Sequence, residues 1–120
     1  MGKKICWIKA GSILGTEPTG YEKAPEFLID AGLNRLITTD TPVIDIPDLN
    51  GRYIRERDET GMLNSKALRD YSITLKKYIA AIVKEKQFPI VLGGDCSLLL
   101  GITPALKEIG RYGLVTLDGH

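Results

Sequence analysis

Apolar and polar residues follow two alternating patterns along the chain. Short apolar runs bounded by glycine, proline or charged residues are separated by longer stretches with helical spacing, and such short runs are typical of strands. Four of these runs are predicted as strands, at residues 4–10, 41–49, 88–94 and 112–120. The run at 88–94 shows no alternation, which indicates a strand with both faces buried, as in a parallel sheet.

Three stretches between these runs have apolar residues at the spacing of a helix. The clearest covers residues 64–86, where Asn64 or Ser65 is expected to cap the helix start. Its predicted buried face consists of Leu68, Tyr71, Leu75, Tyr78, Ile79 and Ile82. A second helix is predicted over 97–110, with a kink or a fresh turn at Pro104. A shorter one over 24–33 opens at Pro25, and Gly32 suits its end.

Strands separated by helices predict an α/β fold. The order β-α-β-α-β-α-β implies right-handed parallel crossovers within one sheet. A length of 120 residues is enough for one domain.

The composition of the chain argues against some classes of binding partner. The chain is 43% apolar and 26% charged with a net charge of +1, as in a soluble globular protein. Its basic residues are spread out, which argues against nucleic-acid binding. No apolar stretch reaches the roughly 20 residues that span a bilayer, so no membrane partner is expected. Cys6 and Cys96 form no disulfide framework, which favours a cytoplasmic protein with reduced thiols.

Polar residues gather where the third and fourth predicted strands end, at 93–97 and at 118–120. Ligands of open parallel sheets bind beyond the carboxyl ends of the strands. If these two strands are neighbours, Cys96, Asp118 and His120 converge. Thiolate, carboxylate and imidazole are all ligands of transition metals, so the pattern predicts a metal site.

Plainer interpretations of the same residues stay open. Gly93 and Gly94 can serve only to make a tight turn. Cys96 can be a small packing residue, since cysteine is often buried with no reactive role. A Cys96–His120 nucleophilic pair is a further alternative, because a helix start lowers the pKa of a thiol. No Gly-rich phosphate-binding motif of the usual kinds is present.

The run "VLGGDCS" at 91–97, taken with 114–120, resembles the arginase/agmatinase/formiminoglutamase (ureohydrolase) family. That family shows Gly-Gly-Asp-His-Ser at one strand end and Asp-Ala-His-x-Asp at the next. Residues 15–33 and 43–49 are similar to its early glycine loop, Pro-led helix and second strand. The resemblance covers nearly the whole chain and implies a three-layer α-β-α fold with a parallel sheet (arginase/deacetylase-like). Residues 1–120 would be the N-terminal portion of one such domain.

The resemblance implies a hydrolase that uses two Mn²⁺ ions to cleave a C–N bond of a small guanidino or formimino compound. Asp118 matches the family's bridging carboxylate and His120 matches a ligand of one metal. Cys96 lies where the family has a histidine ligand of the other metal, and Asp95 matches an aspartate behind the ligands. Three further residues are implied around the site: Gly93, Gly94 and Ser97.

The sequence departs from the family pattern at Cys96, at Gly119 in place of alanine, and in ending at His120. A thiolate suits zinc better than manganese, so zinc or another metal is a second expectation. We expect this chain to be inactive alone and to depend on a C-terminal segment or a homo-oligomer. The alternatives are a non-catalytic α/β binding or regulatory module with an eroded metal site, and a flavodoxin-like domain without metal.

Overall fold

The structure is a computed structural model that describes residues 2–37, 42–48 and 52–118. In chain order its elements are β1 (Ile5–Ala10), η1 (Tyr21–Lys23), α1 (Ala24–Asp30), α2 (Leu33–Leu36), β2 (Ile44–Asp45), α3 (Ser65–Lys84), β3 (Phe88–Gly93), η3 (Cys96–Leu98) and α4 (Leu99–Ile109). No helix in these ranges is long and apolar enough to cross a membrane.

The three strands form one parallel sheet in the order β2-β1-β3. β1 pairs with β3 along its whole length, from Ile5 opposite Phe88 to Ala10 opposite Gly93. The pairing with β2 is short and places Ile8 opposite Ile44. The central strand is therefore β1, and its carboxyl end lies between the ends of the other two.

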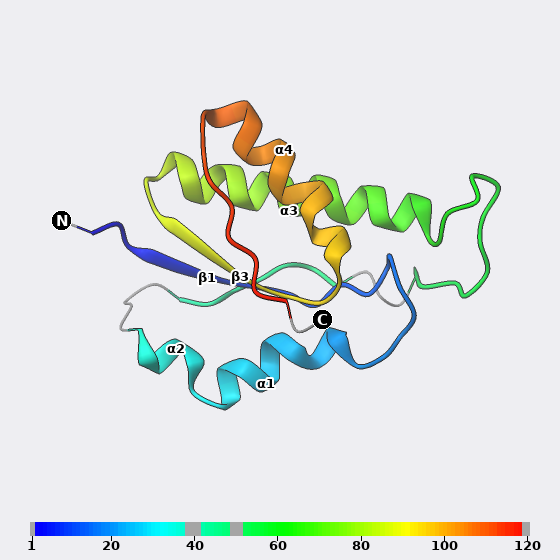
Figure 1. Ribbon diagram of the computed structural model, residues 1–120, viewed down its shortest axis with the longest axis horizontal. Helices are drawn as coiled ribbons and strands as arrows, with labels where there is room; N and C mark the ends of the chain where they lie inside the picture. The colour runs from blue at the N-terminus through cyan, green and yellow to red at the C-terminus, as the bar shows by residue number, and fades with distance from the viewer. Residues whose placement is uncertain (1, 38–41, 49–51, 119–120) are drawn as a thin grey trace.

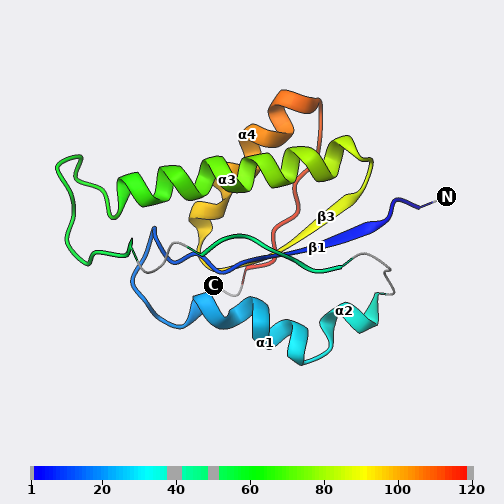
Figure 2. The ribbon, with the colours of Figure 1, turned by 180° about the vertical axis from the view of Figure 1, so that it is seen from behind.

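Helices cover both faces of this sheet. Figure 1 shows α1 and α2 on one side and α3 and α4 on the other, and Figure 2 shows the same layers from behind. Parallel strands need such crossover connections, since each strand must start again at the same end of the sheet. The predicted α/β fold with a parallel sheet is confirmed, as is the layered arrangement.

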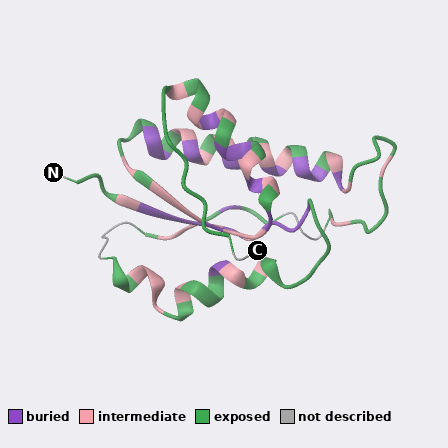
Figure 3. Ribbon diagram, in the orientation of Figure 1, coloured by how far each residue is buried: buried purple, intermediate pink, exposed green. Residues whose placement is uncertain are grey.

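The main core lies between the sheet and the two long helices. Cys6, Ile8 and Ala10 alternate along β1 and point into it. From α3 come Leu75 and Ile79, which are wholly buried, and each buried side chain of this size contributes roughly 1.5–3 kcal/mol. The buried face of α3 is visible in Figure 3 and agrees with the helical spacing in the sequence, except that Tyr78 is only partly buried.

A glycine fixes how closely α4 packs against α3. A Cβ atom added to Gly101 would lie 2.8 Å from the carbonyl oxygen of Ser72. The two helix backbones can therefore approach each other only because residue 101 has no side chain. α4 continues through Pro104 up to Ile109.

The start of α3 differs from the expectation. Asn64 occupies the N-cap position, but its side chain makes no cap hydrogen bond. Its amide instead accepts from the N–H of Ile54 and donates to the carbonyl of Leu14. The carboxylate of Asp58 accepts from the N–H of Ser65 at 2.9 Å and takes over the role of the cap.

The predicted helix over 24–33 is α1, which ends at Asp30, shortly before Gly32, as expected. Gly32, whose φ of 92° lies in the left-handed region, precedes the short helix α2, which was not predicted. Pro25 occupies the first turn of α1, as predicted. The predicted strand over 41–49 shortens to Ile44–Asp45, and both ends of that range lie outside the described residues.

The prediction of a strand over 112–120 is wrong for the part that is described. Residues 111–118 belong to no strand, and all of them are exposed. Figure 1 shows this segment running back from α4 toward the carboxyl ends of the strands. Val115 and Leu117 are 87% and 97% exposed. Without burial of these side chains, nothing offsets the entropy lost in ordering a strand. Residues 119 and 120 lie outside the described residues.

Candidate functional site

The loops that follow β1 and β3 meet at the carboxyl edge of the sheet. The N–H of Gly94 donates to the carbonyl of Ala10 at 3.2 Å, and the N–H of Asp95 donates to that of Ser12 at 2.9 Å. The connection after β1 leads to helices on one face and the connection after β3 to a helix on the other. Such divergence between neighbouring strands creates the crevice in which open α/β sheets bind ligands.

Gly94 is required by this close approach of two backbones. An added Cβ atom would lie 2.0 Å from the carbonyl oxygen of Ser12. At Gly93 an added Cβ would lie 2.3 Å from Cδ1 of Leu98, inside the core. Both glycines therefore have a packing reason that needs no ligand.

Asp95 ties the two loops together. It is only 7% exposed, and its Oδ2 accepts from the N–H of Gly15 at 2.9 Å and from Oγ1 of Thr16 at 3.4 Å. Its Oδ1 accepts from the N–H of Ser97 at 2.9 Å and also from the Ser97 hydroxyl. Both carboxylate oxygens are thus satisfied within the protein, and Asp95 acts as the N-cap of η3.

Cys96 follows this cap and lies at the carboxyl edge of the sheet. Its thiol is free and exposed, and Sγ lies 3.9 Å from Oδ2 of Asp118, to which it donates a weak hydrogen bond. The structure therefore brings together two of the three predicted ligands, although they are 22 positions apart in sequence. His120 lies outside the described residues.

The donor set in the described part is smaller than a complete metal site. Metal–sulfur and metal–oxygen bonds of roughly 2.0–2.3 Å allow one cation to contact both Cys96 and Asp118 at the observed separation. No group of three His, Cys, Asp or Glu side chains that could hold a metal is found among residues 2–37, 42–48 and 52–118. Ser97 and Asp95 bond to each other rather than to the crevice.

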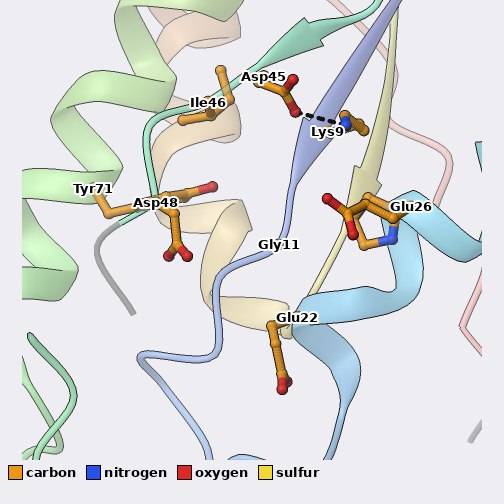
Figure 4. A pocket seen from close by; sticks show the side chains of 9 residues that line it. Lys9, Gly11, Glu22, Glu26, Asp45, Ile46, Asp48 and Tyr71 are labelled. Carbon is orange, nitrogen blue, oxygen red and sulfur yellow. Dashed lines mark ion pairs between the residues drawn. The ribbon is translucent and has the colours of Figure 1, made fainter. Parts of the chain in front are cut away.

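A second polar cluster lies on the other side of β1 and was not predicted from the sequence. It surrounds a small cavity of about 110 Å³, shown in Figure 4, where Lys9 forms an ion pair with Asp45 at 3.0 Å. The lining residues are Lys9, Gly11, Glu22, Pro25, Glu26, Asp45, Ile46, Asp48 and Tyr71. The signal in the sequence was "IDIPD", which places one aspartate at the end of the short second strand and another three residues later.

Tyr71 of α3 lies within electrostatic reach of both clusters. Burial raises the pKa of its phenol, and the charges of Asp48 and Asp95 raise that pKa further. The phenol is therefore neutral at neutral pH. It contributes packing and a dipole to this edge of the sheet, and no negative charge.

Known proteins resemble this chain over most of its length. The family model described as the arginase family matches residues 12–120. An arginase of Staphylococcus aureus is 30% identical over 98% of this chain, which corresponds to 41% of that protein. An arginase of Bacillus subtilis is also 30% identical, over 100% of this chain and 41% of its own length.

Solved structures agree with these sequences. The native arginase of Bacillus caldovelox superimposes with a TM-score of 0.76 at 27% identity, covering 90% of this chain and 38% of that one. A Bacillus subtilis arginase gives a TM-score of 0.70 at 27% identity, covering 90% and 36%. The chain spans about two fifths of the length of the curated relatives it matches. On the family match over residues 12–120, supported by the shared fold, this chain belongs to the arginase family.

Proposed function

We propose that this chain carries part of the metal site of a ureohydrolase, an enzyme that hydrolyses a C–N bond of a small guanidino or formimino compound. The observation that carries the proposal is the 3.9 Å separation of Cys96 Sγ and Asp118 Oδ2, near the carboxyl end of β3. In the proposal, residues 1–120 are the N-terminal portion of one ureohydrolase domain.

Cys96 and Asp118 would together hold one divalent cation, and the family resemblance adds His120 as a third ligand. Divalent cations in such a site lower the pKa of a water molecule and so supply a nucleophile at neutral pH. Mn²⁺ is the metal that the resemblance implies. The Cys96 thiolate favours Zn²⁺ instead, because soft sulfur ligands select softer metals.

Asp95 has a positioning role in this proposal. Its four accepted hydrogen bonds hold the loop after β1 against the start of η3, which orients Cys96 toward Asp118. Gly93 and Gly94 allow the same close packing. Ser97 completes the cap, so the residues around the proposed ligands stabilise the loop on which Cys96 lies.

Three ligands are too few for two metal ions, each of which needs several protein ligands. We therefore expect the chain to bind a cation without turning over substrate by itself. Turnover would require further ligands from a C-terminal segment or from a second copy.

A non-catalytic binding or regulatory module is the second candidate. One observation favours it: Cys96 lies where the family pattern has a histidine. In that case the loops at the strand ends would keep their fold, but the metal site would no longer bind a catalytic cation.

Calorimetric titration of the chain with Zn²⁺ and with Mn²⁺ tests the proposal. We expect one Zn²⁺ per chain, with binding weakened about tenfold or more by Cys96→Ser or Asp118→Asn, since even the loss of a group behind the ligands has an effect of this size. Cys96→His should shift preference toward Mn²⁺. Glu59→Gln removes a carboxylate elsewhere on the surface and serves as the control.

Urea release is measured in parallel for the same variants, alone and with a C-terminal ureohydrolase segment supplied. Activity restored by that segment, and lost with Asp118→Asn, supports the enzyme. No activity of any variant, even with that segment supplied, favours the non-catalytic module with an eroded metal site. Equal metal binding by all variants would mean that neither Cys96 nor Asp118 binds the metal.

A further inference from the structure

A groove runs between α3 and α4 on the outer side of the molecule. Its volume is about 390 Å³. The residues that line it are Met62, Ser65, Leu68, Arg69, Ser72, Ile73, Lys76, Leu100 and Pro104. Three of the apolar side chains remain exposed, with Met62 at 47%, Ile73 at 43% and Leu100 at 55%. The two charged residues in the lining are both basic, so this surface is apolar with a positive rim.

The outer face of α1 has the opposite character. Phe27 is 68% exposed and Leu28 is 41% exposed, while Pro25 is buried against the rest of the molecule. Glu26 and Asp30 lie on the same short helix, and α1 itself contains no basic residue. Figure 3 shows the exposed side of this helix facing away from the sheet. This surface is therefore apolar with a negative rim.

Every molecule carries both surfaces, and they lie on opposite sides of the sheet (Figure 1). We infer that the α3/α4 groove binds the α1 face of a second copy of this chain. Phe27 and Leu28 of one copy pack on the exposed apolar side chains of the groove. Glu26 and Asp30 then lie beside Arg69 and Lys76 of the other copy.

Of the two charges of the groove, that of Arg69 is open to such a partner, and that of Lys76 becomes so by exchanging its ion-pair partner. No ion pair of Arg69 is found in the described part of the chain, and its side chain is exposed. Lys76 pairs with Glu108, an exposed residue of α4, and an exposed ion pair of this kind exchanges partners at small cost. Charge complementarity at the rim of an interface sets which surfaces meet and in what register.

The geometry of this contact is head-to-tail. Two different surfaces meet, so each new copy leaves one groove and one α1 face unused. Such heterologous contacts form rings or open chains and do not stop at two copies. A contact between exposed β3 edges would behave differently, because identical edges pair into closed dimers and depend little on rim charges.

Sedimentation velocity of the 120-residue chain, from micromolar to millimolar concentration, measures this association. We expect species larger than dimers to grow with concentration, and salt to weaken them because exposed charges are screened. Glu26→Lys with Asp30→Lys should raise the dissociation constant about tenfold, as should Arg69→Glu with Lys76→Gln.

Mixing the two double variants provides the decisive test. The basic α1 face of the first matches the acidic groove of the second, and the unchanged surfaces also match. Association should therefore return to the level of the original chain in the mixture. Lys3→Glu with Lys4→Glu, in the N-terminal extension away from both surfaces, is the matched control and should leave association unchanged.

Thermal unfolding of each variant checks that it folds. If one does not, Glu26→Gln with Asp30→Asn replaces it, because these changes remove charge and keep shape. A monomer at all concentrations would overturn the inference. It would also be overturned by a closed dimer that responds to Phe88→Lys on β3 and not to the rim variants, or by a mixture that fails to reassociate.

Discussion

The Oδ2 atom of Asp95 accepts a hydrogen bond from the backbone N–H of Gly15, which lies 80 positions earlier in the chain. This contact joins the loop after the central strand to the loop after the edge strand. The Asp95 side chain is buried, and both oxygens of its carboxylate accept hydrogen bonds. The position of Cys96 therefore depends on a side chain that is itself held in place by the protein.

Removal of this carboxylate should destabilise the whole chain. Asp95→Ala leaves the part-buried N–H groups of Gly15 and Ser97 without their carboxylate acceptor and removes the N-cap of η3. The loss of such a cap and of hydrogen bonds to a charged group costs about 1–3 kcal/mol in the free energy of unfolding. Urea denaturation measures the loss, and Glu59→Ala at an exposed position should change stability by less than about 0.5 kcal/mol. Equal effects of the two changes would contradict a stabilising role of the Asp95 hydrogen bonds.

The backbone contact beside Asp95 yields a second prediction. Gly94→Ala places a Cβ atom 2.0 Å from the carbonyl of Ser12, so β1 and the loop after β3 must separate. We expect a loss of at least about 3 kcal/mol, at the upper end of overpacking costs. Gly113→Ala is the matched control, since nothing lies within 4 Å of its added Cβ. Thermal unfolding of the two variants side by side distinguishes a steric requirement from a general cost of replacing glycine.

The sequence predicted the elements whose signals are local. α3 appeared where apolar residues recur at helical spacing, and β3 appeared as a continuous apolar run, because both patterns follow from the geometry of a single element. The segment at 111–118 has an equally strong strand pattern, but the structure leaves it unpaired with any strand. A strand forms only with a neighbour, and a neighbour is not visible in a local pattern.

The candidate site shows the same limit. The proximity of Cys96 and Asp118 was predicted from the rule that parallel strands end at one edge. The two side chains are close, but residues 111–118 form no strand, so the rule does not account for the contact. The cap of α3 by Asp58 and the ion pair of Lys9 with Asp45 were missed. Each depends on how a loop or a short strand folds back, which spacing does not encode.

The two cysteines should react at very different rates. Cys6 is fully buried on β1, and burial raises the pKa of its thiol, with a further contribution from the charge of Glu85. Cys96 is exposed. We expect a thiol reagent near pH 8 to label one cysteine rapidly and the second only on unfolding, because only the accessible thiolate reacts. Cys96→Ala should abolish the fast phase, and Cys6→Ala should leave it intact. Loss of the fast phase in Cys6→Ala would place the reactive thiol in the core and contradict the structure.

Asp58 should make the stability of the chain depend on acid pH. Hydrogen bonds from Ser65 and from Thr60 hold the pKa of this carboxyl well below its usual range. The unfolded chain therefore binds a proton at a higher pH than the folded chain does. The stability that Asp58 contributes is fully present above the ordinary value of about 3.9, and it is lost as pH falls below that value toward the folded pKa.

Asp58→Asn should lower the free energy of unfolding at neutral pH, because the neutral amide is a weaker acceptor at the start of α3. Its stability should also fall less than that of the original chain between about pH 5 and about pH 2. Glu59→Gln, one position along and exposed, should keep the acid dependence of the original chain. Urea denaturation across this range gives the three profiles. Parallel profiles for Asp58→Asn and the original chain would mean that the cap makes no contribution through its charge, and that α3 starts at Ser65 for reasons of packing alone.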